Sequence, residues 1–411
     1  MLNMKLTKYK LGETLDVTRG ASLSGEFYAT EGKYIRLTCG NFDYQNNCFK
    51  ENKSKDNLYY IGDFKPEFLM EEGDIITPLT EQAIGLLGST AIIPESGKYI
   101  QSQDVAKIIC KEELLDKDFA FYLISSTLVK QQLSAAAQQT KIRHTSPDKI
   151  RDCTVWIPKL TEQKRIGKLL RSLDRKIELN RAINQNLEAM AKQLYDYWFV
   201  QFDFPNVEGK PYKSSGGTMV WNEKLKRFIP KGWESTTLGN ECHMYQPKTL
   251  GLSELDEAAK YKVYGANGVI GKYHTYNHEN SEIAMACRGN SCGTVNRTAP
   301  FSWITGNAMV IKMIDGSIHN EYIKQALQYA NVDGAISGSG QPQLTRENLN
   351  SIKLCKPTRE LIIRFSEQVS NIVEMYLQNE SNIEELTKQR DELLPLLMSG
   401  QVSVNSDLSD D

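Results

Sequence analysis

Two long segments of the chain repeat apolar residues at intervals of three and four, the spacing of a helix that packs along one face. The segments cover residues 159–199 and 358–399. Each follows a short stretch of apolar and β-branched residues that ends in a proline. A threonine follows the proline, three positions later in the first copy (Thr161) and directly in the second (Thr358). Proline ends a strand and threonine caps a helix, so both patterns predict a strand followed by a long helix.

The apolar positions recur about every 3.5 residues along both helices, which favours coiled-coil packing. The first seam consists of Ile166, Leu170, Leu173, Ile177, Leu187, Ala191, Leu194 and Trp198. The second consists of Ile362, Phe365, Val369, Ile372, Tyr376, Ile383, Leu386, Leu393 and Leu397. Polar residues interrupt both seams and are expected to fix register: Asn180, Asn184, Asn379 and Arg390.

A helix of this kind exposes its seam when it is alone, so we expect the two helices to pack on each other as an antiparallel pair. At about 1.5 Å per residue each would be roughly 55–60 Å long. Pro395 is predicted to end or kink the second helix, because proline lacks the backbone N–H that the helix needs.

Each helix follows a globular segment rich in glycine, aromatic and β-branched residues, and proline, glycine and serine mark a linker between the halves. The sequence therefore predicts an α+β protein: two globular α/β domains in a pseudo-two-fold tandem repeat, with two long antiparallel coiled-coil helices. The boundaries are residues 1–158 for the first globular domain, 159–199 for its helix, 200–232 for the linker, 233–357 for the second globular domain, 358–399 for its helix and 400–411 for a disordered tail.

Composition narrows the protein class. The chain has 411 residues and a net charge of −2, so DNA binding would have to come from local patches rather than from a basic surface overall. None of its 8 cysteines forms a Cys-x-x-Cys pair, which indicates reduced thiols. No apolar run approaches the roughly 20 residues of a membrane span, and the N-terminus lacks the features of a signal peptide. We expect a cytoplasmic protein that does not contact membranes.

Three glycine-rich segments of the second globular domain carry candidate chemistry. Asn-Gly between apolar residues predicts a hairpin over 264–274, and 283–295 reads as a strand, a turn and a second strand. Residues 337–344 lead into a short helix. Arginine and side-chain amides can bond base edges bidentately, and lysine pairs with phosphates. The candidate DNA-binding residues here are Lys272, Arg288, Asn290, Gln341, Gln343 and Arg346.

The first globular domain has a corresponding segment at residues 138–145, within a locally basic stretch from Lys130 to Arg151. A glycine-punctuated run at 73–88 is a further candidate. Any one of these segments, taken alone, is better explained by ordinary turn chemistry. Basic, amide-rich turns at matching places in both repeats nevertheless favour a nucleic-acid partner. The candidate residues are Gln138, Gln139, Lys141, Arg143 and His144.

These segments resemble a known family. The Gly-Ala-Asn-Gly hairpin at 265–268, the Arg-Gly-x-x-x-Gly turn at 288–293 and Gly-Ser-Gly-Gln-Pro-Gln-Leu at 338–344 are similar to a target-recognition domain of Type I restriction–modification specificity subunits. The linker residues 198–205 and 230–233 are also similar to that family. The resemblance covers essentially the whole chain. The first domain departs from it, because it lacks the Gly-Ala-Asn-Gly hairpin, as expected if the two domains recognise different sequences.

The resemblance implies a DNA-binding specificity subunit without catalytic activity. Each target-recognition domain would recognise one half of a bipartite site in double-stranded DNA, and two modification (methyltransferase) subunits would grip the helices. Restriction and translocase subunits would complete the complex. It implies no cofactor in this chain, with S-adenosylmethionine, ATP and Mg belonging to partner subunits.

Two enzymatic alternatives lack support in the sequence. Asp148 with Glu162 and Lys164 superficially fits a metal-dependent nuclease, but Pro158 intervenes and Glu162 falls in the first turn of the predicted helix. A methyltransferase would need a Gly-x-Gly loop after a strand and an Asn/Asp-Pro-Pro-aromatic motif, and neither is found.

Two further alternatives stay open at the level of sequence. His274, His278, Cys287 and Cys292 are residue types that zinc favours, yet their spacing brackets a turn and a hairpin, which makes structural roles the better interpretation. A duplicated coiled-coil adaptor that does not bind DNA would explain the helices, but it leaves the matching basic turns without a role.

Overall fold

The computed structural model describes residues 4–53, 56–81, 85–136, 143–338 and 340–404. The chain divides into two compact units, which are described separately. The first unit contains residues 1–178 and 383–411, and the second contains residues 179–382. Both long helices cross this division, so each unit holds one part of each helix.

The long helices are α5 (Leu160–Tyr195), which runs on into a π-helical turn at Asp196–Val200, and α9 (Arg359–Met398). The predicted cap at Thr161 is wrong, because Leu160 is already helical and the first-turn amides bond to the carbonyl of Lys159. Thr358 directly precedes α9, as predicted. Pro395 does not end α9: only one turn remains beyond it, and Gly400 (φ 73°) closes the helix through a bond from the Gln401 amide to the Leu396 carbonyl.

The first unit is built on a central antiparallel sheet of four strands in the order β10-β8-β12-β2. A second sheet has the order β11-β4-β7-β3, and the remaining strands form the pairs β1–β14, β9–β13 and β5–β6. The strands are β1 (Thr7–Lys10), β2 (Leu15–Arg19), β3 (Tyr28–Ala29), β4 (Tyr34–Arg36), β5 (Phe42–Asp43), β6 (Cys48–Phe49), β7 (Tyr59–Tyr60), β8 (Ile75–Pro78), β9 (Thr80–Glu81), β10 (Ala91–Ile92), β11 (Tyr99–Ile100), β12 (Val105–Cys110), β13 (Arg143–His144) and β14 (Thr154–Ile157). The shorter helices are α1 (Leu11–Thr14), α2 (Lys117–Ile124), α3 (Thr127–Ala136) and α4 (Pro147–Arg151).

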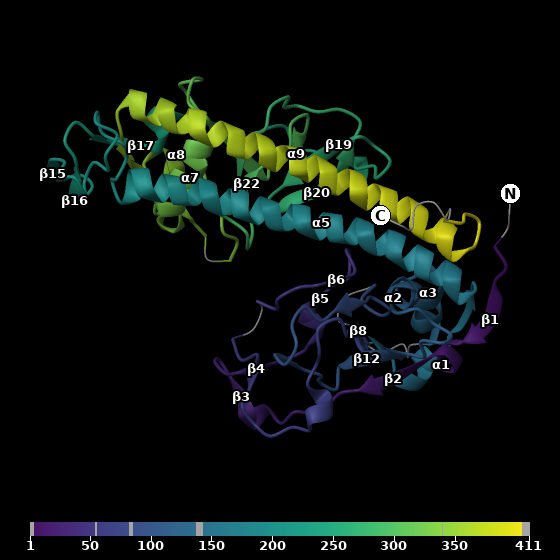
Figure 1. Cartoon of the computed structure of the whole chain (residues 1–411). Coiled ribbons are helices and arrows are strands. Elements are labelled where there is room, and N and C mark those ends of the chain that lie inside the picture. Colours follow the sequence, from purple (N-terminus) through teal and green to yellow (C-terminus); the bar gives the residue numbers. More distant parts are fainter. Residues whose placement is uncertain (1–3, 54–55, 82–84, 137–142, 339, 405–411) are drawn as a thin grey trace. The chain divides into compact units, whose positions relative to one another are not determined.

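The second unit repeats this arrangement, with a central antiparallel sheet in the order β22-β21-β24-β18 and a smaller sheet in the order β20-β19-β23. β17 pairs with β25 as β1 pairs with β14. The strands are β17 (Glu234–Thr237), β18 (Cys242–Tyr245), β19 (Tyr261–Gly265), β20 (Gly268–Tyr273), β21 (Ile283–Ala286), β22 (Val295–Arg297), β23 (Trp303–Ile304), β24 (Ala308–Met313) and β25 (Lys353–Lys356). The shorter helices are α6 (Leu238–Glu241), α7 (Glu321–Tyr329) and α8 (Arg346–Asn350). Figure 1 labels β17, β19, β20, β22, α7 and α8 of this unit.

The repetition extends to the connections. In both units the smaller sheet contains one parallel pair, β4 with β11 and β19 with β23, among antiparallel neighbours. The predicted α+β tandem repeat is therefore confirmed, together with the hairpin over 264–274 and the strand–turn–strand over 283–295.

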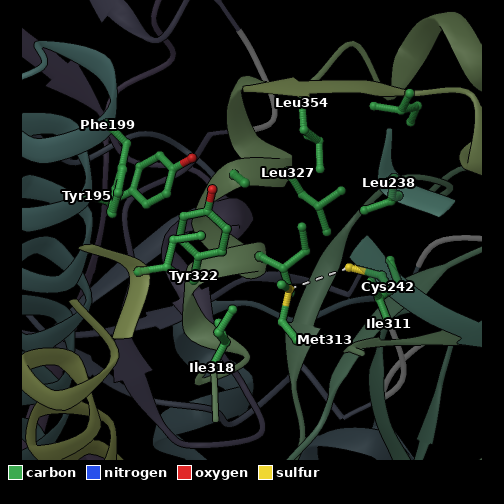
Figure 2. Packing of buried hydrophobic residues seen from close by; sticks show 14 of the residues in the cluster. Tyr195, Phe199, Leu238, Cys242, Ile311, Met313, Ile318, Tyr322, Leu327 and Leu354 are labelled. Atoms are coloured by element: carbon green, nitrogen blue, oxygen red, sulfur yellow. Dashed lines mark hydrogen bonds between the residues drawn. The ribbon is translucent and has the colours of Figure 1, made fainter. Parts of the chain in front are cut away.

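The helix seams pack into the cores of the globular domains as well as facing each other. In the second unit Tyr195 at the end of α5 and Trp198 and Phe199 of the π-helical turn after it lie in one buried cluster, part of which is shown in Figure 2. Phe365 of α9 and Tyr322 of α7 belong to the same cluster. In the first unit the buried cluster similarly includes residues from both helices: Ile166, Leu170 and Leu397. In each half, the helix residues and the domain residues thus share one hydrophobic core. This explains why the first seam ends in aromatic residues.

The polar interruptions of the seams make specific contacts. Asn184 is buried and its side-chain amide donates to Glu380 Oε1 at 2.7 Å. Arg390 donates from Nη1 to Asp174 Oδ1 at 2.9 Å, and the hydroxyl of Tyr122 donates to the other oxygen of Asp174. In the second unit Trp198 faces Phe365 while Asn184 faces Glu380, so the helices run antiparallel there, as predicted.

The linker and tail differ from a simple connector and a free end. Within 200–232 the strands β15 (Met219–Asn222) and β16 (Arg227–Pro230) form an antiparallel hairpin, and Phe202 and Ile229 are buried in the core of the second unit. We predicted a disordered tail from residue 400. Residues 400–404 instead belong to the first unit, where the Met4 amide donates to the Gly400 carbonyl at 3.3 Å and Val404 packs on the core.

Candidate nucleic-acid interface

A tight glycine turn follows β21 in the second unit. The Gly293 amide donates to the Ala286 carbonyl at 2.8 Å, and the Cys292 amide donates to the Gly289 carbonyl at 3.0 Å. Gly289 and Gly293 have φ of 78° and 90°, values that a residue with a Cβ adopts only under strain. The glycines therefore hold the turn in a shape that leaves the side chains of Arg288 and Asn290 exposed.

The loop at 337–344 lies directly against this turn. The Gly289 amide donates to the Pro342 carbonyl at 3.1 Å, and the Leu344 amide donates to the Cys287 carbonyl at 3.0 Å, so Arg288 stands opposite Gln343. Ser337 and Gln343 exchange two further backbone bonds, which close the loop on itself. Four predicted residues thus form one exposed surface, called here the paired-turn surface: Arg288, Asn290, Gln341 and Gln343.

The polar groups of the paired-turn surface remain available to a ligand. In the described part of the chain the Arg288 guanidinium makes no ion pair, and the amides of Asn290, Gln341 and Gln343 make no side-chain hydrogen bond. A guanidinium and three amides can satisfy the donor and acceptor groups on base edges. Exposed and without partners, they have the chemistry of a DNA-binding surface.

Buried groups behind the turn fix its position. Cys287 is buried, and its sulfur accepts a hydrogen bond from Gln246 Nε2 at 3.1 Å. Burial raises the pKa of the Cys287 thiol, which makes it a neutral packing residue rather than a nucleophile. On the loop side Thr345 caps α8, because its hydroxyl accepts from the Asn348 amide at 3.2 Å. A surface held in this way needs little reordering to bind.

The other two predicted residues of this domain lie apart from the paired turns. Lys272 is half-buried on β20, in the smaller sheet, where it stands opposite Lys262. Arg346 is exposed in the first turn of α8, just beyond the end of the loop. Arg346 therefore extends the paired-turn surface along the chain, whereas Lys272 belongs to a different part of the domain.

The first unit has a counterpart built from β9 and β13. Thr80 stands opposite His144 and Glu81 opposite Arg143, and the Thr145 amide donates to the Leu79 carbonyl at 2.9 Å. This bond corresponds to the one from Leu344 to Cys287, because β8 and β21 occupy the same place in their sheets. The predicted residues Arg143 and His144 therefore lie where Pro342 and Gln343 lie in the second unit. Gln138, Gln139 and Lys141 lie outside the described residues.

Arg143 differs from Arg288 in having partners within the protein. Its Nη1 donates to Ser134 Oγ at 3.0 Å and lies 3.6 Å from Glu81 Oε2. His144 is exposed, with Nδ1 3.4 Å from Thr80 Oγ1. Arg143 is therefore partly a structural residue, and His144 is the freer side chain of the two.

The locally basic stretch of the first domain is also partly structural. The Arg151 guanidinium bonds Asp16 and Asp148, at 2.9 and 2.7 Å. Burial lowers the pKa of Lys130, which is only half exposed. Less positive charge is therefore available for phosphates here than the sequence indicates.

The counterpart of Arg288 in the first unit is Thr80, which sequence reasoning did not single out. Its hydroxyl lies 3.3 Å from Asp104 Oδ1 and close to His144. The only signal was its place inside the glycine-punctuated run 73–88. Recognising it required the pairing of β9 with β13, which brings together residues far apart in the sequence.

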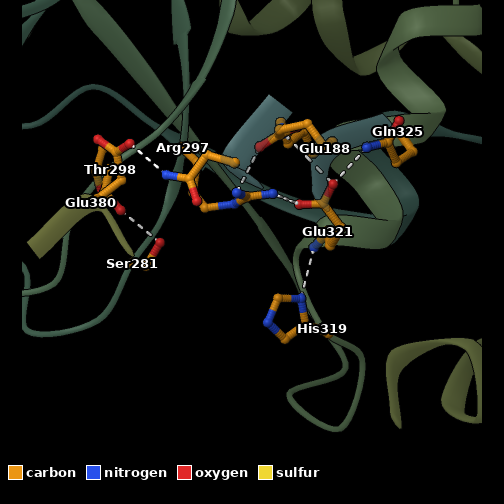
Figure 3. Close-up of polar contacts among 10 residues, drawn as sticks. Glu188, Ser281, Arg297, Thr298, His319, Glu321, Gln325 and Glu380 are labelled. Atoms are coloured by element: carbon orange, nitrogen blue, oxygen red, sulfur yellow. Dashed lines mark hydrogen bonds and ion pairs between the residues drawn. The ribbon is translucent and has the colours of Figure 1, made fainter. Parts of the chain in front are cut away.

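A buried ionic cluster attaches the second globular domain to α5. Arg297 at the end of β22 donates to Glu188 of α5 at 2.8 Å and pairs with Glu321 of α7 (Figure 3). Lys324 of α7 also pairs with Glu188. Burial alone would raise the pKa of Glu188, but the charges of Arg297 and Lys324 outweigh it and lower that pKa. β22 is the strand that leaves the paired turn, so this cluster fixes the surface relative to the second-unit part of α5.

The alternative zinc interpretation finds no support. The buried His278 bonds the Tyr245 hydroxyl at 2.8 Å, and Cys287 bonds Gln246. Among the residues that the structure describes, no three histidine, cysteine or acidic side chains are grouped so that they could hold a metal.

Glu162 of the nuclease alternative pairs with Arg165 on the same helix, at 3.0 Å. The helices described here include none that is long and apolar enough to cross a membrane.

Comparison with known proteins gives one consistent family. The family model for the Type I restriction modification DNA specificity domain matches residues 3–189 and 230–385. The chain is 23% identical over 327 residues to the Type I restriction enzyme MjaIX specificity subunit of Methanocaldococcus jannaschii, an alignment that covers 74% of this chain and 73% of that protein. It is 23% identical over 383 residues to the HindI specificity subunit of Haemophilus influenzae, covering 75% and 81%.

A solved structure shares the fold. The crystal structure of the Type I restriction–modification S subunit from M. genitalium aligns with a TM-score of 0.61 and 19% identity, over 97% of both chains. The alignment includes both globular domains and both long helices.

Proposed function

Because the chain belongs to the Type I restriction–modification DNA specificity family, we propose that it recognises DNA for such a complex and catalyses no reaction itself. Each globular domain recognises one half of a bipartite double-stranded site. The observation that carries this proposal is the paired turn, which both units build from equivalent strands and which exposes different side chains in each: Arg288 and Gln343 in one, His144 in the other.

The helices and partner proteins complete the proposal. The exposed faces of α5 and α9 dock two modification subunits, which supply the methyl-transfer chemistry with S-adenosylmethionine. Restriction and translocase subunits supply ATP- and Mg-dependent translocation and cleavage. We place the protein in the cytoplasm, with its DNA. The adaptor alternative is weaker, because it leaves the unpaired guanidinium and amides of the paired-turn surface without a role.

Binding measurements test this function. Methylated adenines mapped in the host genome give the bipartite site, and the purified chain is then titrated with duplexes that carry the whole site, one half or neither. We expect the whole site to bind at least about 10³-fold more tightly than unrelated DNA, and log K to fall linearly with log salt concentration. Equal affinity for all three duplexes at every salt concentration would contradict the proposal.

A further inference from the structure

The hairpin β15–β16 lies in the linker ahead of β17 and belongs to the second unit. The hairpin exposes large apolar side chains: Trp221 and Phe228 form an edge-to-face pair with ring centres 5.3 Å apart and are 48% and 58% exposed. The Trp221 indole N–H also donates to Glu223 Oε1 at 2.8 Å. Large aromatic side chains that are this exposed are typical of a surface that another protein covers.

A cavity of about 280 Å³ opens beside the hairpin. Its charged lining comes from Lys224 and Arg227 at the hairpin and Lys353 of β25. Aromatic residues form much of the rest, including Tyr195 and Tyr329. The cavity lies within the second unit, next to the hairpin whose strands are labelled β15 and β16 in Figure 1.

The charge in this cavity is not balanced from within. Among the residues that the structure describes, no carboxylate lines the cavity, and Lys224, Arg227 and Lys353 make no ion pair. The Tyr329 hydroxyl donates to the Asp196 carboxylate, which does not line the cavity and pairs with Lys192 at 2.6 Å. Lys224, Arg227 and Lys353 line the cavity and are exposed, so an anion that enters is attracted by three cations at once.

Neutral contacts hold two of the three cations. Lys353 Nζ donates to the carbonyl of Lys224 at 3.1 Å, and the Arg227 guanidinium lies 5.6 Å from the centre of the Phe202 ring. Arg227 and Lys353 are therefore partly positioned before an anion binds, which lowers the cost of binding.

Size and surroundings indicate what the anion belongs to. A cavity of this volume is smaller than most sites for whole small molecules, which measure about 300–1,000 Å³, but it accommodates the end of a side chain. The neighbouring Trp221 and Phe228 would gain from an apolar cover, which a polypeptide provides and a DNA phosphate does not. A second copy of this chain would bring the same cations face to face, so a different protein fits better.

We propose that the β15–β16 hairpin and its cavity form a docking surface for an acidic segment of the modification subunit. An aspartate or glutamate carboxylate enters between Lys224, Arg227 and Lys353, and apolar side chains beside it cover Trp221 and Phe228. This contact is separate from the faces of α5 and α9, and it rests on the proposed function, because that function supplies the partner.

Affinity for the purified modification subunit tests the proposal. The double variant Arg227→Glu/Lys353→Glu should bind at least about tenfold more weakly than the parent, because the carboxylate would meet like charge. The matched control is Lys210→Glu/Lys231→Glu, which makes the same change in charge at exposed residues that do not line the cavity, and it should bind like the parent. Denaturation midpoints and DNA affinity of each variant alone show whether the fold has changed.

A second variant tests the same surface without changing a residue that lines the cavity. Trp221→Ser/Phe228→Ser changes only exposed positions and should also weaken the complex, and a photo-crosslinking residue at position 221 should label a segment that contains aspartate or glutamate. Parent-like affinity of both double variants, or a crosslink to a segment without acidic residues, overturns the proposal. If the parent chain itself fails to bind the modification subunit, the proposed function fails as well, and the two results are distinguishable.

Discussion

In the first unit the helices are joined by a charged contact at a place where the second unit is apolar. Asp174 of α5 and Arg390 of α9 pair at 2.9 Å, with side chains 11% and 9% exposed. Counted from the starts of the two helices, the same places in the second unit hold Val373 and Ala191, both buried in its core. The duplicated fold therefore tolerates either an ion pair or an apolar contact at one position of the helix pair.

In the central sheets the opposite holds, because there the second unit has the charged contact and the first unit the apolar residue. Arg297 of the second unit sits in an ionic cluster with Glu188 and Glu321, and the matching place in the first sheet, judged by the register of β8 with β10, holds Ile92. The two units thus share their apolar pattern but differ in where they bury charge.

Breaking the charged contact should give the largest effect. Arg390→Ala leaves Asp174 buried without its cation and should destabilise the first unit by about 3–5 kcal/mol. Chemical denaturation followed by amide hydrogen exchange should show protection lost in α2 and the first-unit part of α5, with the core around Phe365 less affected.

The same contact also allows the comparison to be tested directly. The triple variant Asp174→Val/Arg390→Ala/Tyr122→Phe gives the helix positions the residues of the second unit and removes the hydroxyl that bonds Asp174. It should recover most of the stability that Arg390→Ala loses, because replacing a whole buried ion pair by apolar residues is often neutral. A triple variant no more stable than the single one would show that the two helix positions are not equivalent.

The paired turns offer the next comparison, between a free and an internally bonded arginine. Arg288→Ala should weaken binding to the specific site by about 1–3 kcal/mol and relax one base position, because a bidentate contact to a guanine would be lost. The free energy of unfolding of the Arg288→Ala variant should hardly differ from that of the parent, since Arg288 has no ion pair in the described residues. Arg143→Ala is the matched variant and should shift the denaturation midpoint, as it removes the bond to Ser134. Unchanged site preference in a folded Arg288→Ala protein would remove that residue from the interface.

A smaller effect is expected from the turn's backbone. Gly289 has φ 78° where the first unit has Glu81 in a strand, so Gly289→Ala should cost roughly 1–2 kcal/mol and also reduce specificity. Gly97, with φ 74°, is the control: like Gly289 it has open space where a Cβ would lie, and it is away from the paired turn. Gly97→Ala should lower stability similarly without changing base preference. Equal effects of the two variants on specificity would mean that the turn geometry is not used in recognition.

Much of the architecture could be predicted because it depends on local spacing. The apolar period of the helices, the prolines before them and the Asn-Gly hairpin are short-range signals, and α5, α9 and β19–β20 appear where they indicate. The cap at Thr161 was wrong, because α5 already starts at Leu160, two positions before the start that this cap implies. Pro395 does not end α9, which continues to Met398.

The site was less predictable because it depends on long-range pairing. Arg288 and Gln343 were found through their residue types, but the sequence did not show that they face each other, nor that Arg143 is bonded to Ser134. The sequence indicates only a linker where the β15–β16 hairpin lies, because the proline, glycine and serine residues of 205–217 dominate the pattern just ahead of Trp221 and Phe228. In the sequence, a charged residue that pairs within the protein cannot be told from one that is available to a ligand. The fold is needed to distinguish them.

The smallest effect is expected from Lys141. We expect Lys141 to contact a phosphate in the first unit, and Arg288 to contact a base in the second. Lys141 lies outside the described residues, so its role stays a prediction from sequence. Lys141→Ala should weaken binding to specific and random duplexes by the same factor, because a lysine–phosphate contact carries no sequence information. The slope of log K against log salt concentration should flatten by about 0.9, as one fewer counterion is released. Lys65→Ala, at an exposed lysine near Glu67, is the control and should leave the slope unchanged. If Lys141→Ala instead altered the preferred base at one position of the first half-site, Lys141 would contact bases, and the two units would both use a long cation for recognition.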